Sequence, residues 1–112
     1  MVTKYVPEKG DIVWLDFDPS RGKEIMKMRP AYVISRRLFN EHVNMAIVAP
    51  ITSTIRGVNL EVLLPEKLLT QGSILVYQLK TLDFTERNIK FIEKAPKKIV
   101  DRVAEIVHVI TN

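Results

Sequence analysis

The chain contains no cysteine, only four glycines and one tryptophan, and no long apolar run. The absence of cysteine excludes a disulfide framework, a thiol nucleophile and a zinc–thiolate site. The longest uncharged stretch, residues 43–55, falls short of the roughly 20 apolar residues that a membrane helix requires. The first residues also lack the apolar core of a signal peptide. We therefore expect a soluble, cytoplasmic protein with no membrane partner.

The composition is that of a globular chain: 46% of the 112 residues are hydrophobic and 27% are charged. This length predicts a single domain over residues 1–112. The formal net charge is only +4, but basic residues are concentrated between residues 20 and 37. Opposed there only by Glu24, they are Arg21, Lys23, Lys27, Arg29, Arg36 and Arg37. Such a segment either attracts phosphates or an acidic partner, or is simply a solvated basic loop.

Short runs of strand-forming residues recur along the chain. Strands are predicted over residues 10–18, 30–35, 44–51, 58–64, 73–80 and 88–94. In the fourth of these the even positions are all apolar, which predicts a strand buried on one face. A short helix is expected over residues 36–42 and one helical turn over 65–72, ended by Gly72. Residues 20–29 show no coherent period and are expected to form a long mobile loop.

The C-terminal segment has helical periodicity and begins near Pro96. Its apolar positions are Ile99, Val100, Val103, Ile106, Val107 and Ile110, and charged residues and His108 take the opposite face. These β-branched residues have low helix propensity, so the helix is expected to depend on docking against a sheet. The pattern predicts a mostly β, α+β domain, either a partly open barrel or a coiled sheet, of short strands with one C-terminal amphipathic helix.

Several kinds of catalytic or metal site find no support in the sequence. Asp16 and Asp18 alternate on one strand and could share a metal ion, but no acidic cluster supplies further ligands, and Asp18 before Pro19 fits a turn. Neither histidine has the partner of a nucleophilic triad, and no glycine-rich phosphate loop is present. We therefore expect neither a metal nor a cofactor, and hydrolase-triad, kinase and dehydrogenase functions are disfavoured.

The polar run Thr52-Ser53-Thr54 follows an apolar strand and offers short hydroxyl donors. Arg29 and the basic segment before it offer charged, planar donors that suit a phosphate. From composition alone, however, Thr52-Ser53-Thr54 could equally be an ordinary loop before Arg56-Gly57.

Four blocks of residues resemble the MazF/PemK/ChpB family of bacterial toxins. They are Gly10-Asp11-Ile12-Val13-Trp14-Leu15-Asp16-Phe17-Asp18-Pro19, then Gly22 with Glu24, then Arg29-Pro30-Ala31, then Ala49-Pro50-Ile51-Thr52-Ser53. The resemblance covers nearly the whole chain. It implies an SH3-like (CcdB/PemK-type) partly open barrel that forms a homodimer. It also implies metal-independent, sequence-specific cleavage of single-stranded RNA, often mRNA, to a 2′,3′-cyclic phosphate and a 5′-hydroxyl, and inhibition by an acidic MazE/PemI-like antitoxin.

The same resemblance assigns candidate site residues. Arg29 and Thr52 match the family's main catalytic pair, and Glu24 matches a glutamate on a loop that is also implicated. The RNA-binding candidates are Phe17, Arg21, Lys23, Lys27, Ser53, Thr54, Arg56, Tyr77, Gln78, Lys80 and Arg87. The chain departs from the family at Tyr77, where some members have an aspartate proposed as general base. Either Glu24 serves as the base, or Tyr77 binds RNA, or the family's assignment of the base is wrong. Structurally, Tyr77 could also be a strand aromatic that packs at a dimer edge.

A rival hypothesis is a non-catalytic toxin of the same fold that inhibits DNA gyrase, as CcdB does. Those toxins need a C-terminal Trp-Gly-Ile. Here the only tryptophan is Trp14, in the first predicted strand, and the last residues are Thr111-Asn112. An endoribonuclease is therefore the favoured expectation.

Overall fold

The computed structural model describes residues 4–17, 28–54, 57 and 59–112. Its elements are β1 (Asp11–Asp16), β2 (Met28–Val33), α1 (Arg37–Val43), β3 (Ala46–Thr52), β4 (Glu61–Leu63), β5 (Ser73–Leu75), η2 (Val76–Gln78), β6 (Lys80–Leu82), η3 (Phe84–Glu86), β7 (Lys90–Lys94) and α2 (Lys97–Thr111). The strands of the described residues form an antiparallel sheet in the order β4-β5-β3-β2-β1-β7, with β6 also paired to β3. The sheet is not closed, which confirms the expected partly open barrel.

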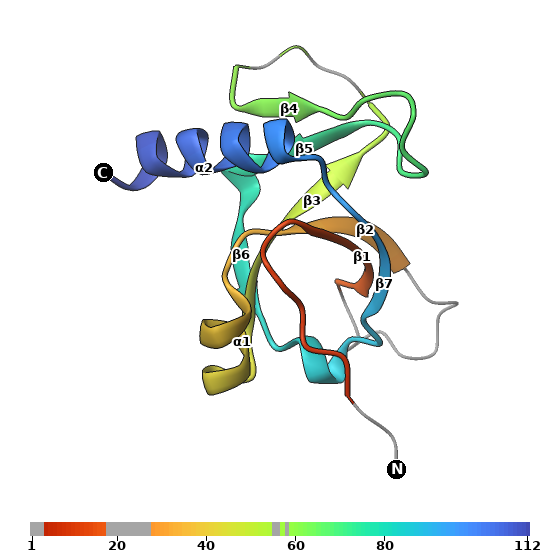
Figure 1. Cartoon of the computed structure of the whole chain (residues 1–112), viewed down its shortest axis with the longest axis vertical. Helices are drawn as coiled ribbons and strands as arrows, with labels where there is room; N and C mark the ends of the chain where they lie inside the picture. The colour runs from red at the N-terminus through yellow and green to blue at the C-terminus, as the bar shows by residue number, and fades with distance from the viewer. Residues whose placement is uncertain (1–3, 18–27, 55–56, 58) are drawn as a thin grey trace.

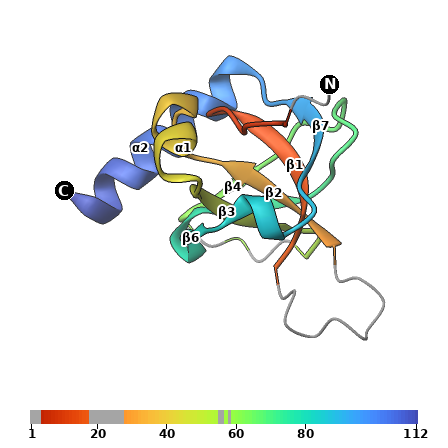
Figure 2. The ribbon, with the colours of Figure 1, turned by 90° about the horizontal axis from the view of Figure 1, so that it is seen from below.

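The three long strands β1, β2 and β3 separate two hydrophobic cores because their successive side chains point to opposite faces. Tyr32 and Ala49 enter the first core, which α2 covers with Ile99, Val103 and Ile106. The second core contains Val13, Leu15, Ala31, Val33, Ala46, Val48, Leu82 and Phe84. In Figure 1, α2 lies along β4 and β5 at one end of the molecule, and α1 lies at the other end beside β6. Figure 2 shows β1 beside β7, the edge strand.

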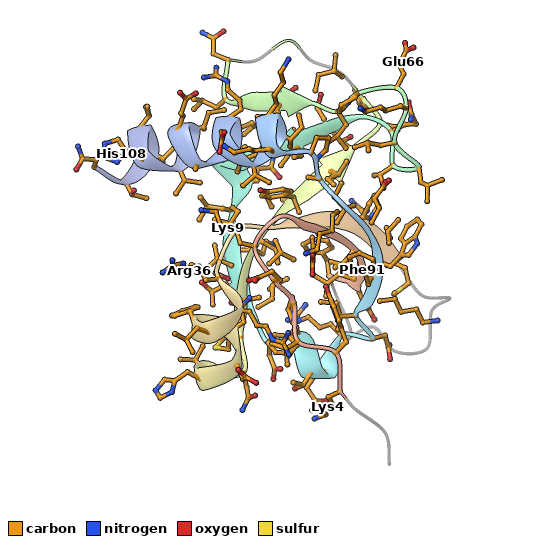
Figure 3. All side chains as sticks on the ribbon, viewed as in Figure 1. Lys4, Lys9, Arg36, Glu66, Phe91 and His108 are labelled. Atoms are coloured by element: carbon orange, nitrogen blue, oxygen red, sulfur yellow. The ribbon has the colours of Figure 1, made fainter. Side chains whose placement is uncertain are left out.

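The C-terminal helix follows the sequence prediction closely. Pro96 precedes its first residue, and the three most deeply buried side chains fall at helical spacing on the face toward the sheet. His108 is exposed near the free end of α2, pointing away from the sheet (Figure 3), as expected. The β-branched apolar stripe is therefore stabilised by docking, because burial outweighs its low intrinsic helix propensity.

The predicted continuous strand over residues 73–80 is wrong. The chain forms β5, turns through η2 and continues as β6, so that Ile74 pairs with Ile51 whereas Lys80 pairs with Val48. The 3₁₀ turn lets the two short strands pair with different halves of β3, which bends between them. The sequence hides this corner because the apolar run of β5 continues into Val76, and no glycine or proline interrupts residues 73–80.

Other boundaries differ by a few residues. β2 begins at Met28, so the end of the expected loop is extended strand, and the strand predicted over 58–64 is reduced to β4. Its alternation is nevertheless confirmed, since Val62 and Leu64 are buried and Leu63 is exposed. The expected helical turn over 65–72 is a hydrogen-bonded turn, in which the Leu68 N–H donates to the Pro65 carbonyl at 3.2 Å.

The turn before β5 is tied to the far edge of the sheet by Glu93 of β7. Its carboxylate accepts hydrogen bonds from the backbone N–H groups of Leu69 (3.1 Å) and Thr70 (2.8 Å). Burial alone would raise the pKa of Glu93, but these hydrogen bonds outweigh it and hold the pKa below its ordinary value. Because the folded-state pKa is depressed, the stabilisation is present above the ordinary glutamate pKa. It is lost as the pH falls through the folded-state value.

We therefore expect Glu93→Gln to lower the melting temperature at neutral pH, and we expect the difference from the unmodified protein to shrink between about pH 5 and pH 3. Thermal unfolding across this range measures the effect. Glu66→Gln, on an exposed side chain of the same turn, is the matched control. A constant difference between Glu93→Gln and the unmodified protein at every pH would contradict the assignment.

Within the described ranges, no helix combines the length and apolar character needed to span a membrane.

Candidate active site

The two principal candidates lie at neighbouring strand ends on one face of the sheet. Arg29 lies near the start of β2 and Thr52 is the last residue of β3. The register of β2 and β3 pairs Ala31 with Pro50, so Arg29 and Thr52 each lie two residues beyond this pair on their strands. The twofold alternation of strands places both on the same side as Val33 and Val48, at the mouth of the second core. The tertiary fold thus brings together residues that are 23 positions apart in sequence (52 − 29).

The backbone of Arg29 is held in the sheet by its neighbour β1. Its register partner on β1 is Leu15, which is fully buried, whereas Arg29 itself is exposed. Among the described residues, nothing accepts a hydrogen bond from its guanidinium or forms an ion pair with it. The sheet therefore fixes the backbone of Arg29, and its guanidinium is available to bind a phosphate.

Thr52 is half-buried and pairs with Ser73 of β5. Its Oγ1 accepts a hydrogen bond from the backbone N–H of Thr54 at 3.1 Å. A hydroxyl has one donor and two acceptor sites, so this bond occupies an acceptor site and leaves the proton available for donation. Ser53 and Thr54 continue past the strand end and are both exposed.

Phe17 and Lys80 flank the same mouth. Phe17 follows β1 and packs against the second core, and the Lys80 ammonium lies 5.5 Å from the centre of its ring. Lys80 is the first residue of β6 and the partner of Val48 on β3. An aromatic ring beside a cation is suited to stacking a nucleobase and contacting a phosphate.

Arg87 supports this end of β1. Its Nη1 donates to the carbonyl oxygens of Asp16 (3.3 Å) and Phe17 (2.8 Å), and its own carbonyl accepts from the Asp16 N–H (3.0 Å). The half-buried guanidinium therefore holds the backbone of Phe17 in place. The prediction that Arg87 also contacts RNA is neither supported nor opposed by these bonds.

The remaining candidates divide into two groups. Tyr77 and Gln78 are exposed residues of η2, which packs against both β3 and α2. Whether Tyr77 binds RNA or packs at a dimer edge stays a prediction. Five candidates lie outside the described residues: Arg21, Lys23, Glu24, Lys27 and Arg56. In the part of the chain that the structure describes, no group of three metal-ligating side chains occurs, and Asp18 lies outside that part.

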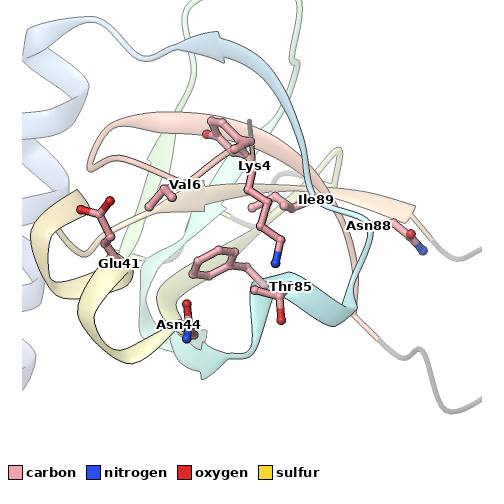
Figure 4. Close-up of a pocket in the computed structure, with 9 residues that line it drawn as sticks. Lys4, Val6, Glu41, Asn44, Thr85, Asn88 and Ile89 are labelled. Atoms are coloured by element: carbon pink, nitrogen blue, oxygen red, sulfur yellow. The ribbon is translucent and has the colours of Figure 1, made fainter. Parts of the chain in front are cut away.

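A cavity of about 240 Å³ lies elsewhere, between the N-terminal segment, α1 and η3, and no predicted site residue lines it (Figure 4). Its walls include Val6, Glu41, Asn44 and Thr85, above the buried Phe84. Sequence reasoning did miss one residue at the Arg29–Thr52 face. Gly72 packs directly on the Thr52 backbone, whereas its sequence context suggested only the end of a helical turn.

Comparisons with known proteins give consistent results. The sequence profile of the PemK-like, MazF-like toxins of type II toxin–antitoxin systems matches residues 8–111. The chain is 37% identical over 87 residues to the endoribonuclease toxin MazF of Escherichia coli K12, covering 78% of each protein. It is 38% identical over 106 residues to the endoribonuclease toxin ChpB of the same strain, covering 90% of each. Among solved structures, a MazE–MazF crystal structure from Deinococcus radiodurans superposes with a TM-score of 0.85 at 29% identity, covering 96% of both chains.

Proposed function

This chain belongs to the family of PemK-like, MazF-like toxins of type II toxin–antitoxin systems, and we propose that it is a metal-independent endoribonuclease that cleaves single-stranded RNA at the mouth of its second core. The observation that carries the proposal is the β2–β3 register, by which Arg29 and Thr52 face the same side at adjacent strand ends. An exposed guanidinium beside an available hydroxyl supplies two of the donors that a phosphoryl-transfer transition state needs.

The proposed reaction is an internal transesterification. The ribose 2′-oxygen attacks its own phosphorus, the P–O5′ bond breaks, and a 2′,3′-cyclic phosphate and a 5′-hydroxyl result. Glu24 takes the 2′-hydroxyl proton as general base, and the leaving 5′-oxygen receives a proton from Arg29, which regains one from solvent. Arg29 and Thr52 also hydrogen-bond the non-bridging oxygens as negative charge develops on the phosphorane. The P–O bond changes are confined to the RNA, and the protons move through Glu24, Arg29 and solvent, so the proposed steps use no metal or cofactor.

The surroundings fit an RNA strand that crosses this mouth. Phe17 offers a ring for a base, and Lys80 offers a charge for the backbone. The positive charges of Arg29 and Lys80 also suit an acidic antitoxin segment. The relative from Deinococcus radiodurans was crystallised with MazE. We infer that such a segment competes with RNA, that the toxin acts as a homodimer, and that both act in the cytoplasm.

The decisive experiment is incubation of the purified protein with a mixed single-stranded RNA in EDTA. We expect cleavage at a restricted set of sites, with cyclic phosphate and 5′-hydroxyl ends, since no metal takes part. An acidic antitoxin peptide should raise the apparent KM without changing the maximal rate. Absence of cleavage, or cleavage only when a divalent metal is restored, would overturn the proposal. Cleavage that persists under saturating antitoxin would contradict only the inference that the antitoxin and RNA compete for one surface.

A further inference from the structure

Gly72, one residue before β5, touches the backbone of Thr52 so closely that no side chain fits between them. Its φ of +117° lies in a region that favours glycine. A Cβ built on Gly72 would lie 2.1 Å from the Thr52 carbonyl oxygen and 2.8 Å from its carbonyl carbon. Both atoms are backbone, so an added methyl group could be accommodated only if β3 or the start of β5 moved.

The strand start that contacts Thr52 is held on both sides. The Gly72 carbonyl accepts a hydrogen bond from the Leu64 N–H at 2.8 Å, which ties it to the end of β4. Ser73, the next residue, is buried and is the register partner of Thr52. Because β5 is paired with β4 on one side and β3 on the other, displacement at Gly72 is transmitted to Thr52, at the exposed end of β3.

The other side of Thr52 is held by the chain that follows it. The Thr54 N–H donates to the Thr52 Oγ1 at 3.1 Å, so the hydroxyl is bonded to the same backbone whose position Gly72 sets. Gly72 therefore controls the carbonyl side of Thr52, and Thr54 controls its hydroxyl side.

We propose that Gly72 is a positioning residue for catalysis: its bare backbone seats Thr52 so that the hydroxyl, oriented by the Thr54 N–H, donates its proton toward the scissile phosphate. The inference rests on the proposed endoribonuclease function for its catalytic consequence. Its structural part stands independently, as a statement about where Thr52 lies. A displacement of about 1 Å at a reacting group commonly costs about 100-fold in rate, so a methyl group at Gly72 acts far beyond its size.

The chain provides a matched control. Gly10 also has a positive φ, of +94°, and a Cβ there would meet the Val100 side chain at 3.1 Å. Gly10→Ala therefore imposes the same kind of positive-φ strain, whereas its Cβ meets only a side chain of α2, with a milder clash, and does not touch Thr52. Comparing the two variants separates general strain from displacement of Thr52.

The test is a double-mutant cycle in single-turnover RNA cleavage, with Gly72→Ala, Thr52→Ala, the double variant and Gly10→Ala. We expect Gly72→Ala to reduce the cleavage rate about 100-fold while RNA binding is retained, and Gly10→Ala to cleave as the unmodified protein does. In the Thr52→Ala background, Gly72→Ala should cause no further loss, because the group it positions is gone. A full additional loss in that background, or an unchanged rate for Gly72→Ala, would overturn the inference.

Amide NMR gives an independent readout that does not require cleavage. Gly72→Ala should shift the Thr52 and Thr54 amide resonances and speed exchange of the Thr54 N–H, whereas Gly10→Ala should not. If the unmodified protein fails to cleave RNA but these shifts appear, the proposed function fails and the seating of Thr52 stands. Unchanged resonances overturn the seating.

Should Gly72→Ala not fold, Thr54→Pro compared with Thr54→Ala tests the same arrangement from the exposed side, because both variants lose the Thr54 side chain and only the proline also fixes φ and removes the N–H that donates to Thr52. When Thr52 is present, we expect Thr54→Pro to reduce the cleavage rate. In the Thr52→Ala background, we expect it to cause no further loss. Equal losses in both backgrounds contradict the proposal.

Discussion

Arg29→Ala should reduce the rate of RNA cleavage about 10²–10³-fold, the usual consequence of removing one preorganised donor from a charged transition state. The guanidinium is exposed and has no partner among the described residues, so its loss leaves no buried group unsatisfied. Its backbone pairs with Leu15 in β1 whatever the side chain. We therefore expect the melting temperature to stay unchanged while the single-turnover cleavage rate falls by this factor.

Two further variants sharpen this test. Arg29→Lys keeps the positive charge but loses the planar fork, so it should recover only part of the rate. Lys90→Ala removes an exposed cation from β7, outside the predicted site, and should cleave normally. If Arg29→Ala cleaves RNA as the unmodified protein does, the proposed mechanism is wrong. If Lys90→Ala loses as much activity as Arg29→Ala, the effect is one of general electrostatics.

The largest loss of stability is expected at Asn40, the fully buried polar residue of α1. Its Nδ2 donates to the carbonyl oxygens of Pro7 (2.9 Å) and Ser35 (3.1 Å), and its Oδ1 accepts from the Ser35 hydroxyl (2.5 Å). Ser35 Oγ in turn accepts from the Ile47 N–H at 2.8 Å. Asn40 thus ties α1 to the N-terminal segment and to the residues after β2, and Ser35 extends this network to the start of β3.

Asn40→Ala leaves these buried groups without partners and opens a cavity, so the free energy of unfolding should fall by about 3–4 kcal/mol. For a domain of this size, that corresponds to a drop in melting temperature of roughly 10–20 °C. Thermal and urea unfolding measure both quantities. Asn59→Ala, at an exposed asparagine, is the control and should change neither. A loss below about 1 kcal/mol for Asn40→Ala would show that water replaces the amide.

Periodicity alone was sufficient for the parts of the fold that follow one simple rule. The helix from Lys97 and the alternation of Val62, Leu63 and Leu64 were visible because a buried face must recur at the period of its element. The corner at Val76–Gln78 was not visible, because the apolar residues of β5 run on into Val76 without a proline or glycine to mark the change of partner. The choice of partner is a long-range property.

The candidate site shows the same division. Arg29 and Thr52 were identified from the sequence, chiefly by the motif blocks they belong to, and composition alone left them as ordinary loop residues. Their placement on one face depends on the register between β2 and β3, which no local pattern contains. Arg87 shows a further limit, since nothing in the sequence indicates that its guanidinium donates to the backbone carbonyls of Asp16 and Phe17.

By itself, the sequence determined the family and excluded several kinds of site. The absence of cysteine excludes thiol and zinc–thiolate chemistry, and the blocks around Trp14, Arg29 and Thr52 identify the relatives of the chain. Only the tertiary structure decided that Gly72 seats Thr52, that Asn40 joins three segments, and that Phe17 lies beneath Lys80. The physical reason is that these contacts depend on the pairing of strands distant in sequence, whereas periodicity and motif spacing report only what lies nearby along the chain.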